Sequence, residues 1–350
     1  MNRTPLTSHP AGRASVRIIA AGIVVGFCYW ASSVVITLLL SVLLAYFLDP
    51  LVEGLERLHV HRILGSLLAV LIMLALIGGL GWVFWDRLTH FAEDWPKYQG
   101  VLRDAVAGVR ERIEAFERRV SELAPQRPSS RPIVQLEDRP GSLLLRGLGS
   151  LYVFLLAVSF LPFLVFFMLV YKHRLWHATL QLFPASERTR VKHALDDINA
   201  MLRSFVVGNV LVAVILGLVT SLFFWLLGLD YPVLTGIASG FLNLVPYLGV
   251  VLAWIPPLII GLAQLKSWWM FFTMIGVLSF FHLIAINVLV PALVGHKVHL
   301  NALAATVALL FWGWLWGGLG LILAIPITAT VKVICDHVEP WRPIGRWLGA

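Results

Sequence analysis

An apolar run from Val233 to Leu262 is broken near its middle by polar and helix-breaking residues, and this break constrains the fold most strongly. The run is long enough to cross a bilayer, because about 20 residues rising about 1.5 Å each cover about 30 Å of hydrocarbon. Within it stand Asn243, Pro246 and Gly249. Proline removes a helical hydrogen bond, and backbone groups freed in this way are tolerated at membrane depth only where they face protein or water. Transporters build substrate sites from such broken helices, so the run predicts a transport pathway.

The composition places the rest of the chain in a membrane as well. Of 350 residues, 59% are hydrophobic and only 13% are charged, which is not the balance of a soluble domain. Hydropathy predicts eight spans, of which the first two are short enough to form a tight hairpin. Their approximate bounds are 16–30, 32–48, 63–85, 143–171, 203–228, 233–262, 267–290 and 301–334. We therefore predict an all-α polytopic membrane protein with about eight transmembrane helices, a broken sixth helix and amphipathic interfacial helices.

The distribution of Lys and Arg predicts the orientation. With a cytoplasmic N-terminus, fifteen of these residues fall on the inside, Lys266 among them, and only Lys297 falls in a short outer loop. This asymmetry follows the positive-inside rule and places both termini in the cytoplasm. The net charge of +8 is thus explained by topology and anionic membrane lipids, and it indicates no nucleic-acid partner.

The predicted spans and polar stretches divide the chain into four segments. Residues 1–85 hold the first three helices, 86–142 a polar segment, 143–338 a transport core with the other helices, and 339–350 a cytoplasmic tail. In the polar segment Asp94 is placed to cap a helix with Pro96 in its first turn. Apolar residues recur every three or four positions from there to Leu123, which predicts an amphipathic helix on the membrane surface or in a seam between subunits. The stretch from Pro125 to Pro140 reads as a connector.

Signs of catalysis are weak in this sequence. His296 and His299 flank Lys297 with no carboxylate nearby, which makes a poor metal site. Cys28 and Cys335 match no metal or redox spacing. Because no nucleophile, phosphate-loop or metalloprotease motif is found, we predict no catalytic residue, no metal and no cofactor.

Few ionisable residues occur in or beside the apolar spans, and these are candidates for ion coupling. His282 lies within the seventh span, while Asp49 ends the second and Asp230 ends the fifth. A titratable group at membrane depth is costly and tends to face a cavity or a partner. The alternative for His282 is a neutral imidazole bonded between helices, and for the two aspartates a place at the membrane interface.

Polar uncharged residues provide the candidates for the pathway itself. An unpaired amide in hydrocarbon costs several kcal/mol, so an intramembrane Asn either bonds helices together or lines a path. Residues 317–320 repeat the Gly-Gly-Leu-Gly string of residues 78–81, which is too short to establish an internal repeat. The candidate pathway residues are Asn209, Asn243, Pro246, Tyr247, Gly249, Asn287 and Pro291.

Several of these residues also carry a family resemblance. Asn243-Leu-Val-Pro-Tyr-Leu-Gly249, Asn287-Val-Leu-Val-Pro291 with the residues that follow, and Gly317-Gly-Leu-Gly with the residues up to Pro326 resemble the C-terminal signature of the autoinducer-2 exporter family. Tyr46-Phe-Leu-Asp-Pro50 is similar to the family's sequence after its second span. The resemblance implies a bacterial inner-membrane transporter that forms homo-oligomers, in a family with members linked to autoinducer-2 export and others to exchange of sodium or lithium for protons.

One departure from the family pattern bears on the substrate. Many relatives carry an acidic residue just before the Asn of the Asn-x-x-x-Pro element, and here that residue is Ile286. Without this carboxylate, a cation/proton antiporter is harder to build, and His282 is the one well-placed titratable group. We therefore expect an exporter of a small polar solute, with a sodium(lithium)/proton antiporter and a non-transporting oligomeric scaffold as the alternatives.

Overall fold

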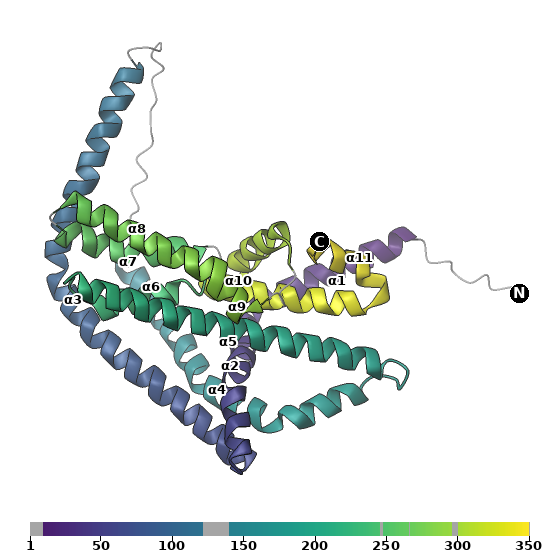
Figure 1. Cartoon of the computed structure of the whole chain (residues 1–350). Coiled ribbons are helices and arrows are strands. Elements are labelled where there is room, and N and C mark those ends of the chain that lie inside the picture. Colours follow the sequence, from purple (N-terminus) through teal and green to yellow (C-terminus); the bar gives the residue numbers. More distant parts are fainter. Residues whose placement is uncertain (1–9, 122–139, 246–247, 266, 296–299, 350) are drawn as a thin grey trace, which may run out of the picture. The chain divides into compact units, whose positions relative to one another are not determined.

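The computed structural model describes residues 10–121, 140–245, 248–265, 267–295 and 300–349, and within these ranges the regular structure is helical throughout (Figure 1). The prediction of an all-α protein is confirmed. The helices are α1 (Pro10–Trp30), α2 (Ser32–Arg57), α3 (Arg62–Ser121), α4 (Pro140–Gln181), α5 (Arg188–Leu226), α6 (Pro232–Leu242), α7 (Leu248–Gln264), α8 (Trp268–Ile284), the π-helix η1 (Ala285–Leu289), α9 (Val290–Leu293), α10 (Ala302–His337), the 3-10 helix η3 (Glu339–Trp341) and α11 (Arg342–Gly349).

Five of the described helical segments are long and apolar enough to cross a membrane. They are Ser32–Arg57, Arg62–Pro96, Arg188–Leu226, Trp268–Leu293 and Ala302–His337. Helices α6 and α7 are apolar but shorter. The chain divides into two compact units. Unit 1 comprises residues 1–67, 151–198 and 299–350, and unit 2 comprises residues 68–150 and 199–298.

In unit 1, the eighth predicted span is a hairpin and not a single crossing helix. Trp312 donates a hydrogen bond from Nε1 to Oγ1 of Thr328 over 3.1 Å, whereas a straight helix would separate residues 16 apart by about 24 Å. The chain turns at Gly317, whose φ of 62° and ψ of −139° are not helical. The start of α10 lies against α11, because the backbone N–H of Asn301 donates to the Leu348 carbonyl over 2.9 Å. The N-terminal and C-terminal ends of α10 therefore lie on the same side of the turn at Gly317.

In unit 2, the broken sixth helix is a second hairpin. The break is confirmed: α6 ends at Leu242 and α7 starts at Leu248. The run does not cross, however, since the residues that flank it are hydrogen-bonded to each other. Gln264 accepts from the Asp230 backbone N–H over 2.7 Å and donates to the Asp230 carboxylate over 2.6 Å. A continuous helix would separate these two residues by about 51 Å, so α6 enters and α7 returns on the same side.

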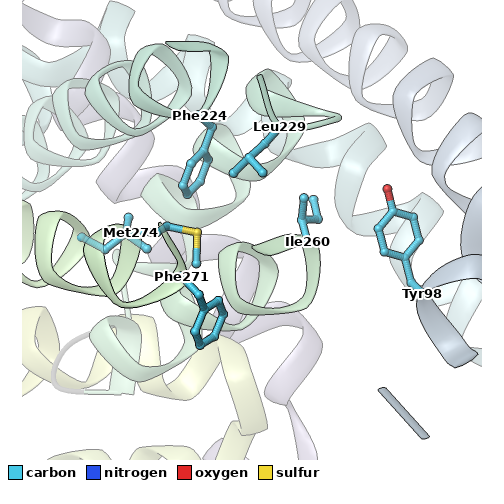
Figure 2. Packing of buried hydrophobic residues seen from close by; sticks show 7 residues of the cluster. Tyr98, Phe224, Leu229, Ile260, Phe271 and Met274 are labelled. Carbon is cyan, nitrogen blue, oxygen red and sulfur yellow. The ribbon is translucent and has the colours of Figure 1, made fainter. Parts of the chain in front are cut away.

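A buried apolar cluster holds the hairpin against its neighbours in unit 2 (Figure 2). Phe224 and Leu229 come from the end of α5 and the turn after it, Ile260 from α7, and Phe271 and Met274 from α8. Met274 fills the space beside Gly261, where an added Cβ would lie 2.8 Å from the Met274 sulfur. Tyr98 of α3 joins the same cluster with 3% of its surface exposed. This packing holds the C-terminal end of α7 and the N-terminal end of α8 beside the end of α5.

Two local predictions are wrong at their boundaries. Asp94 does not cap a separate helix, because α3 continues through it and through Pro96 to Ser121; the Asp94 carboxylate instead accepts a hydrogen bond from Tyr231. Pro96 removes one helical hydrogen bond, which bends a helix without ending it. At Ala31, near-helical dihedrals (φ −90°, ψ 22°) bend the chain between α1 and α2 and do not reverse it as the predicted tight hairpin requires. The four-segment division of the chain stays a prediction.

Candidate functional site

The tip of the α6–α7 hairpin carries two of the predicted pathway residues and brings them together. Asn243 caps the C-terminus of α6 and is half-buried. Gly249 is buried in the first turn of α7, where an added Cβ would lie 2.7 Å from the Leu242 carbonyl oxygen and 2.8 Å from Cα of Asn243. No side chain larger than hydrogen fits there, which is why the sequence has glycine. Pro246 and Tyr247 lie outside the described residues.

Glycines hold the descending arm of the hairpin directly against α5. An added Cβ on Gly236 would lie 2.7 Å from the Gly217 carbonyl, and one on Gly240 would lie 2.9 Å from Cα of Gly217. The Gly236/Gly240 spacing of four thus serves close helix packing, as small residues do in membrane proteins. With the backbones this close, α6 is held at a defined depth along α5.

Trp254 lies on α7, the other arm of the hairpin. Its ring contacts His282, the clearest ionisable candidate. His282 lies on α8 with 3% of its surface exposed, and its Nδ1 is 2.9 Å from the Leu278 carbonyl. Since a carbonyl only accepts, Nδ1 carries the proton, and Nε2 of the neutral ring is an acceptor. The ring centroids of His282 and Trp254 are 6.3 Å apart at 69°.

Both rings present polar atoms that are buried without a partner among the described residues. These are Nε2 of His282 and Nε1 of Trp254. One is an acceptor and the other is a donor. A hydroxyl group or a water molecule offers the complementary pair, because it both donates and accepts. Burying such groups unpaired costs about 1–3 kcal/mol each, so the arrangement favours a polar guest.

Two hydroxyl groups in the described part of unit 2 are also buried without a hydrogen-bond partner. Thr220 of α5 and Ser239 of α6 are fully buried, and their side-chain oxygens have no partner among the described residues. Ser239 lies next in sequence to Gly240, in the arm that packs on α5. The buried polar groups on the hairpin and on the adjacent α5 therefore include Ser and Thr side chains. Sequence reasoning passed over them, since Ser and Thr are common in transmembrane helices.

The remaining pathway candidates do not join this group. Asn209 is half-buried on α5 and donates to the Phe205 carbonyl of its own helix over 2.8 Å. Asn287 lies in the π-helix η1, where it is exposed and donates to the Leu283 carbonyl over 2.8 Å. Pro291 is exposed in α9. The side of η1 that packs on α5 is apolar and includes Ala285, so the exposed Asn287 points away from that contact.

The two aspartates proposed for ion coupling have different surroundings. Asp49 belongs to unit 1, with 2% of its surface exposed, and its carboxylate lies 2.5 Å from Nζ of Lys172 and 3.7 Å from a guanidinium nitrogen of Arg62. Arg62 also donates to Glu56 and to the Leu169 carbonyl, which ties α2, α3 and α4 together. Buried carboxylates paired in this way hold helices in place.

Asp230 is exposed in the turn between α5 and α6 and bonds to Gln264, as described above. Gln264 also donates to the phenol oxygen of Tyr98 over 2.9 Å, and Tyr231 donates to Asp94 over 2.6 Å. Burial of the Tyr231 ring and the neighbouring Asp94 carboxylate raise the pKa of Tyr231 above its ordinary value. These bonds tie both ends of the hairpin to α3, and sequence reasoning missed them because the partners are far apart along the chain.

Comparisons with known proteins find relatives over nearly the whole chain. The model of the AI-2E family transporters matches residues 18–339. YrrI of Bacillus subtilis (strain 168), provisionally named a transport protein, is 28% identical over 87% of this chain and 86% of its own length. The AI-2 transport protein TqsA of Escherichia coli (strain K12) is 25% identical over 90% and 89%. PerM of the same strain, provisionally named a permease, is 25% identical over 97% and 96%.

Proposed function

Because this chain belongs to the AI-2E family of transporters, we propose that it moves a small, uncharged polar solute across the bacterial inner membrane. It is a multi-pass membrane protein, and its relatives carry transport names. The name of the distant relative TqsA gives AI-2 as its cargo, so a signalling molecule of the autoinducer-2 type is the first candidate for the solute. Export, the inner membrane, the cytoplasmic termini and assembly into homo-oligomers belong to this proposal.

The buried donor and acceptor on Trp254 and His282 carry the proposal. A solute that carries hydroxyl groups offers a partner to each of these groups, because a hydroxyl both donates and accepts, whereas an apolar molecule leaves both unpaired. The hairpin tip supplies the second element, since the chain break and the half-buried side-chain amide of Asn243 place polar groups between α6 and α7. Broken helices with polar groups at membrane depth are the usual sites of secondary transporters. In this proposal Asn243 and Gly249, which flank the break between α6 and α7, lie where the solute is admitted.

A sodium(lithium)/proton antiporter is less well supported. Cation sites are built from several oxygen ligands, among which carboxylates are prominent. Within the described residues no group of three or more His, Cys, Asp or Glu side chains is placed to hold a metal ion. Asp49 is engaged by Lys172, and Asp230 is exposed and bonded to Gln264. The scaffold alternative leaves the buried unpaired groups of the hairpin without a role.

Flux into proteoliposomes that contain the purified chain tests the proposal. Trp254→Phe replaces the indole and its N–H donor by a phenyl ring, and His282→Phe removes the acceptor. Loss of a buried hydrogen bond costs about 1–3 kcal/mol, so we expect each variant to slow autoinducer-2 flux about tenfold. The matched control is Trp268→Phe, since Trp268 is 70% exposed on α8, and its flux is expected to equal that of the wild type.

The same vesicles distinguish the alternatives when they also contain a pH-sensitive dye. A pH change that depends on sodium or lithium and is lost in His282→Phe would establish the antiporter and overturn the neutral-solute proposal. Silence toward both the organic signal and the cations, with the protein folded, would favour the scaffold.

A further inference from the structure

An apolar groove lies between α3 and α6, within unit 2, and the transport proposal does not account for it. Its volume is about 540 Å³. Its apolar walls include Ile77, Leu80 and Phe84 of α3 and Val233, Ile237 and Phe241 of α6. All six are exposed or half-buried. Volumes of this size are typical of sites for small organic molecules, so the groove is large enough to hold a ligand.

Arg87 is the one charged residue in the lining of this groove. Within the part of the chain that the structure describes, its ion-pair partner is Asp86 at 4.0 Å; both side chains are more than half exposed, and such a pair is worth little. The guanidinium group therefore keeps donors for an anion, and its planar fork matches a phosphate. One end of the groove is thus cationic and the rest is apolar.

The position of Arg87 along α3 matches the membrane surface. Asp86 and Arg87 are the first charged residues after an uncharged run that starts at Ile63. Trp82 and Trp85 precede them and are 75% and 66% exposed, as expected of the aromatic belt at the headgroup level. From Arg87 to Ile77 the helix covers about 15 Å, which is half of a hydrocarbon core of about 30 Å. The groove therefore has the depth of one leaflet.

The dimensions and chemistry of the groove select its occupant. A volume of about 540 Å³ along about 15 Å of α3 leaves room for a chain that lies along the helix. An extended peptide would leave its backbone polar groups unpaired, because the lining beyond Arg87 offers no polar side chain. An alkyl chain needs no such partner.

We propose that this groove binds one acyl chain of an anionic phospholipid, with the lipid phosphate at Arg87. The lipid then lies along α6, the descending arm of the hairpin. This inference depends on the membrane location of the chain and not on the identity of the solute, so its failure would leave the transport proposal intact.

Native mass spectrometry of the full-length protein in detergent tests the proposal by measuring binding of phosphatidylglycerol and phosphatidylcholine with identical acyl chains. One favourable cationic contact near the membrane surface is worth about 1 kcal/mol, so the wild type is expected to bind phosphatidylglycerol about fivefold more tightly. Arg87→Gln removes this preference. Ala238→Trp fills the groove, since Ala238 is in its lining, and is expected to abolish the tight site for both lipids; the smaller Ala238→Leu weakens it.

Matched controls share the helix but not the groove. Arg103→Gln changes an exposed arginine of α3, and Leu76→Trp adds a ring at an exposed position of the same helix; both should bind lipid as the wild type does. Equal binding of the two lipids by the wild type, or binding by the folded Ala238 variants at the wild-type level, would overturn the proposal.

Discussion

The contact between α5 and α6 makes a quantitative prediction for Gly240→Ala. The new methyl carbon would lie closest to the Ala213 carbonyl oxygen, and it would lie 2.9 Å from Cα and 3.0 Å from the backbone nitrogen of Gly217. Carbon atoms pack at about 3.5–4.0 Å, so the two helices must separate by about 0.6–1.1 Å. The opposing atoms are backbone and cannot rotate away. Overpacking of this kind costs about 1–3 kcal/mol.

Gly276→Ala is the matched control for this substitution. Gly276 lies in α8 with open space where a Cβ would be added, so it reports only the intrinsic helix preference of alanine, worth up to about 1 kcal/mol. We expect Gly240→Ala to be less stable than Gly276→Ala by about 1–3 kcal/mol when unfolding is followed by SDS titration in mixed micelles. Equal stability of the two variants would refute the close approach of α6 to α5.

Three further predictions follow from the polar contacts and from the α10 hairpin. Lys172→Met leaves the buried Asp49 carboxylate without its nearest cation. It should lower the free energy of unfolding by about 3 kcal/mol in the same assay, because the remaining carboxylate is then a buried charge without its counter-charge. Gly317→Ala should destabilise the protein by about 1–3 kcal/mol, since φ is positive there, whereas Gly318→Ala, with open space around it, should not. The raised pKa of Tyr231 means that its contribution to stability is complete below about pH 10 and declines as the pH rises further; thermal unfolding against pH should show this decline in the wild type and a smaller one in Tyr231→Phe.

The sequence predicted the helical class and the break after Leu242, because hydropathy and proline act locally. It did not predict that the broken run returns to its starting side. That outcome depends on hydrogen bonds between Asp230 and Gln264, which are 34 residues apart and leave no periodic signal. The hairpin in α10 was missed for a related reason: Gly317 belongs to a short repeated string and to a stretch that resembles the family signature, and neither pattern predicts a turn. Gly-Gly-Leu-Gly turns the chain at 317–320 but lies within continuous helix at 78–81, so the string alone does not determine the backbone.

Candidate site residues were predicted with uneven success. His282 was found because an ionisable residue in a long apolar span is rare, but its neighbour Trp254 was not, since tryptophan is common in this chain. Asp49 was interpreted as a coupling residue because nothing local reveals Lys172, which lies 123 positions away. Asn287 looked equivalent to Asn243 in sequence, yet η1 places it on an exposed surface.

The return of α7 to its starting side changes the parity of the crossings. A segment that enters and leaves by one face adds nothing to the count, so α8 must begin on the face where α5 ends. Hydropathy alone assigns the two ends of α8 the opposite way, because it counts residues 233–262 as a crossing. Cysteines introduced at Ser267 and at the exposed Ala292 should therefore react with membrane-impermeant reagents from the periplasm and from the cytoplasm, respectively, if the Arg203 end of α5 is cytoplasmic. A topology map that counts every apolar run as one crossing will therefore assign each loop after a hairpin to the wrong side of the membrane. A second hairpin farther along the chain makes the later assignments correct again.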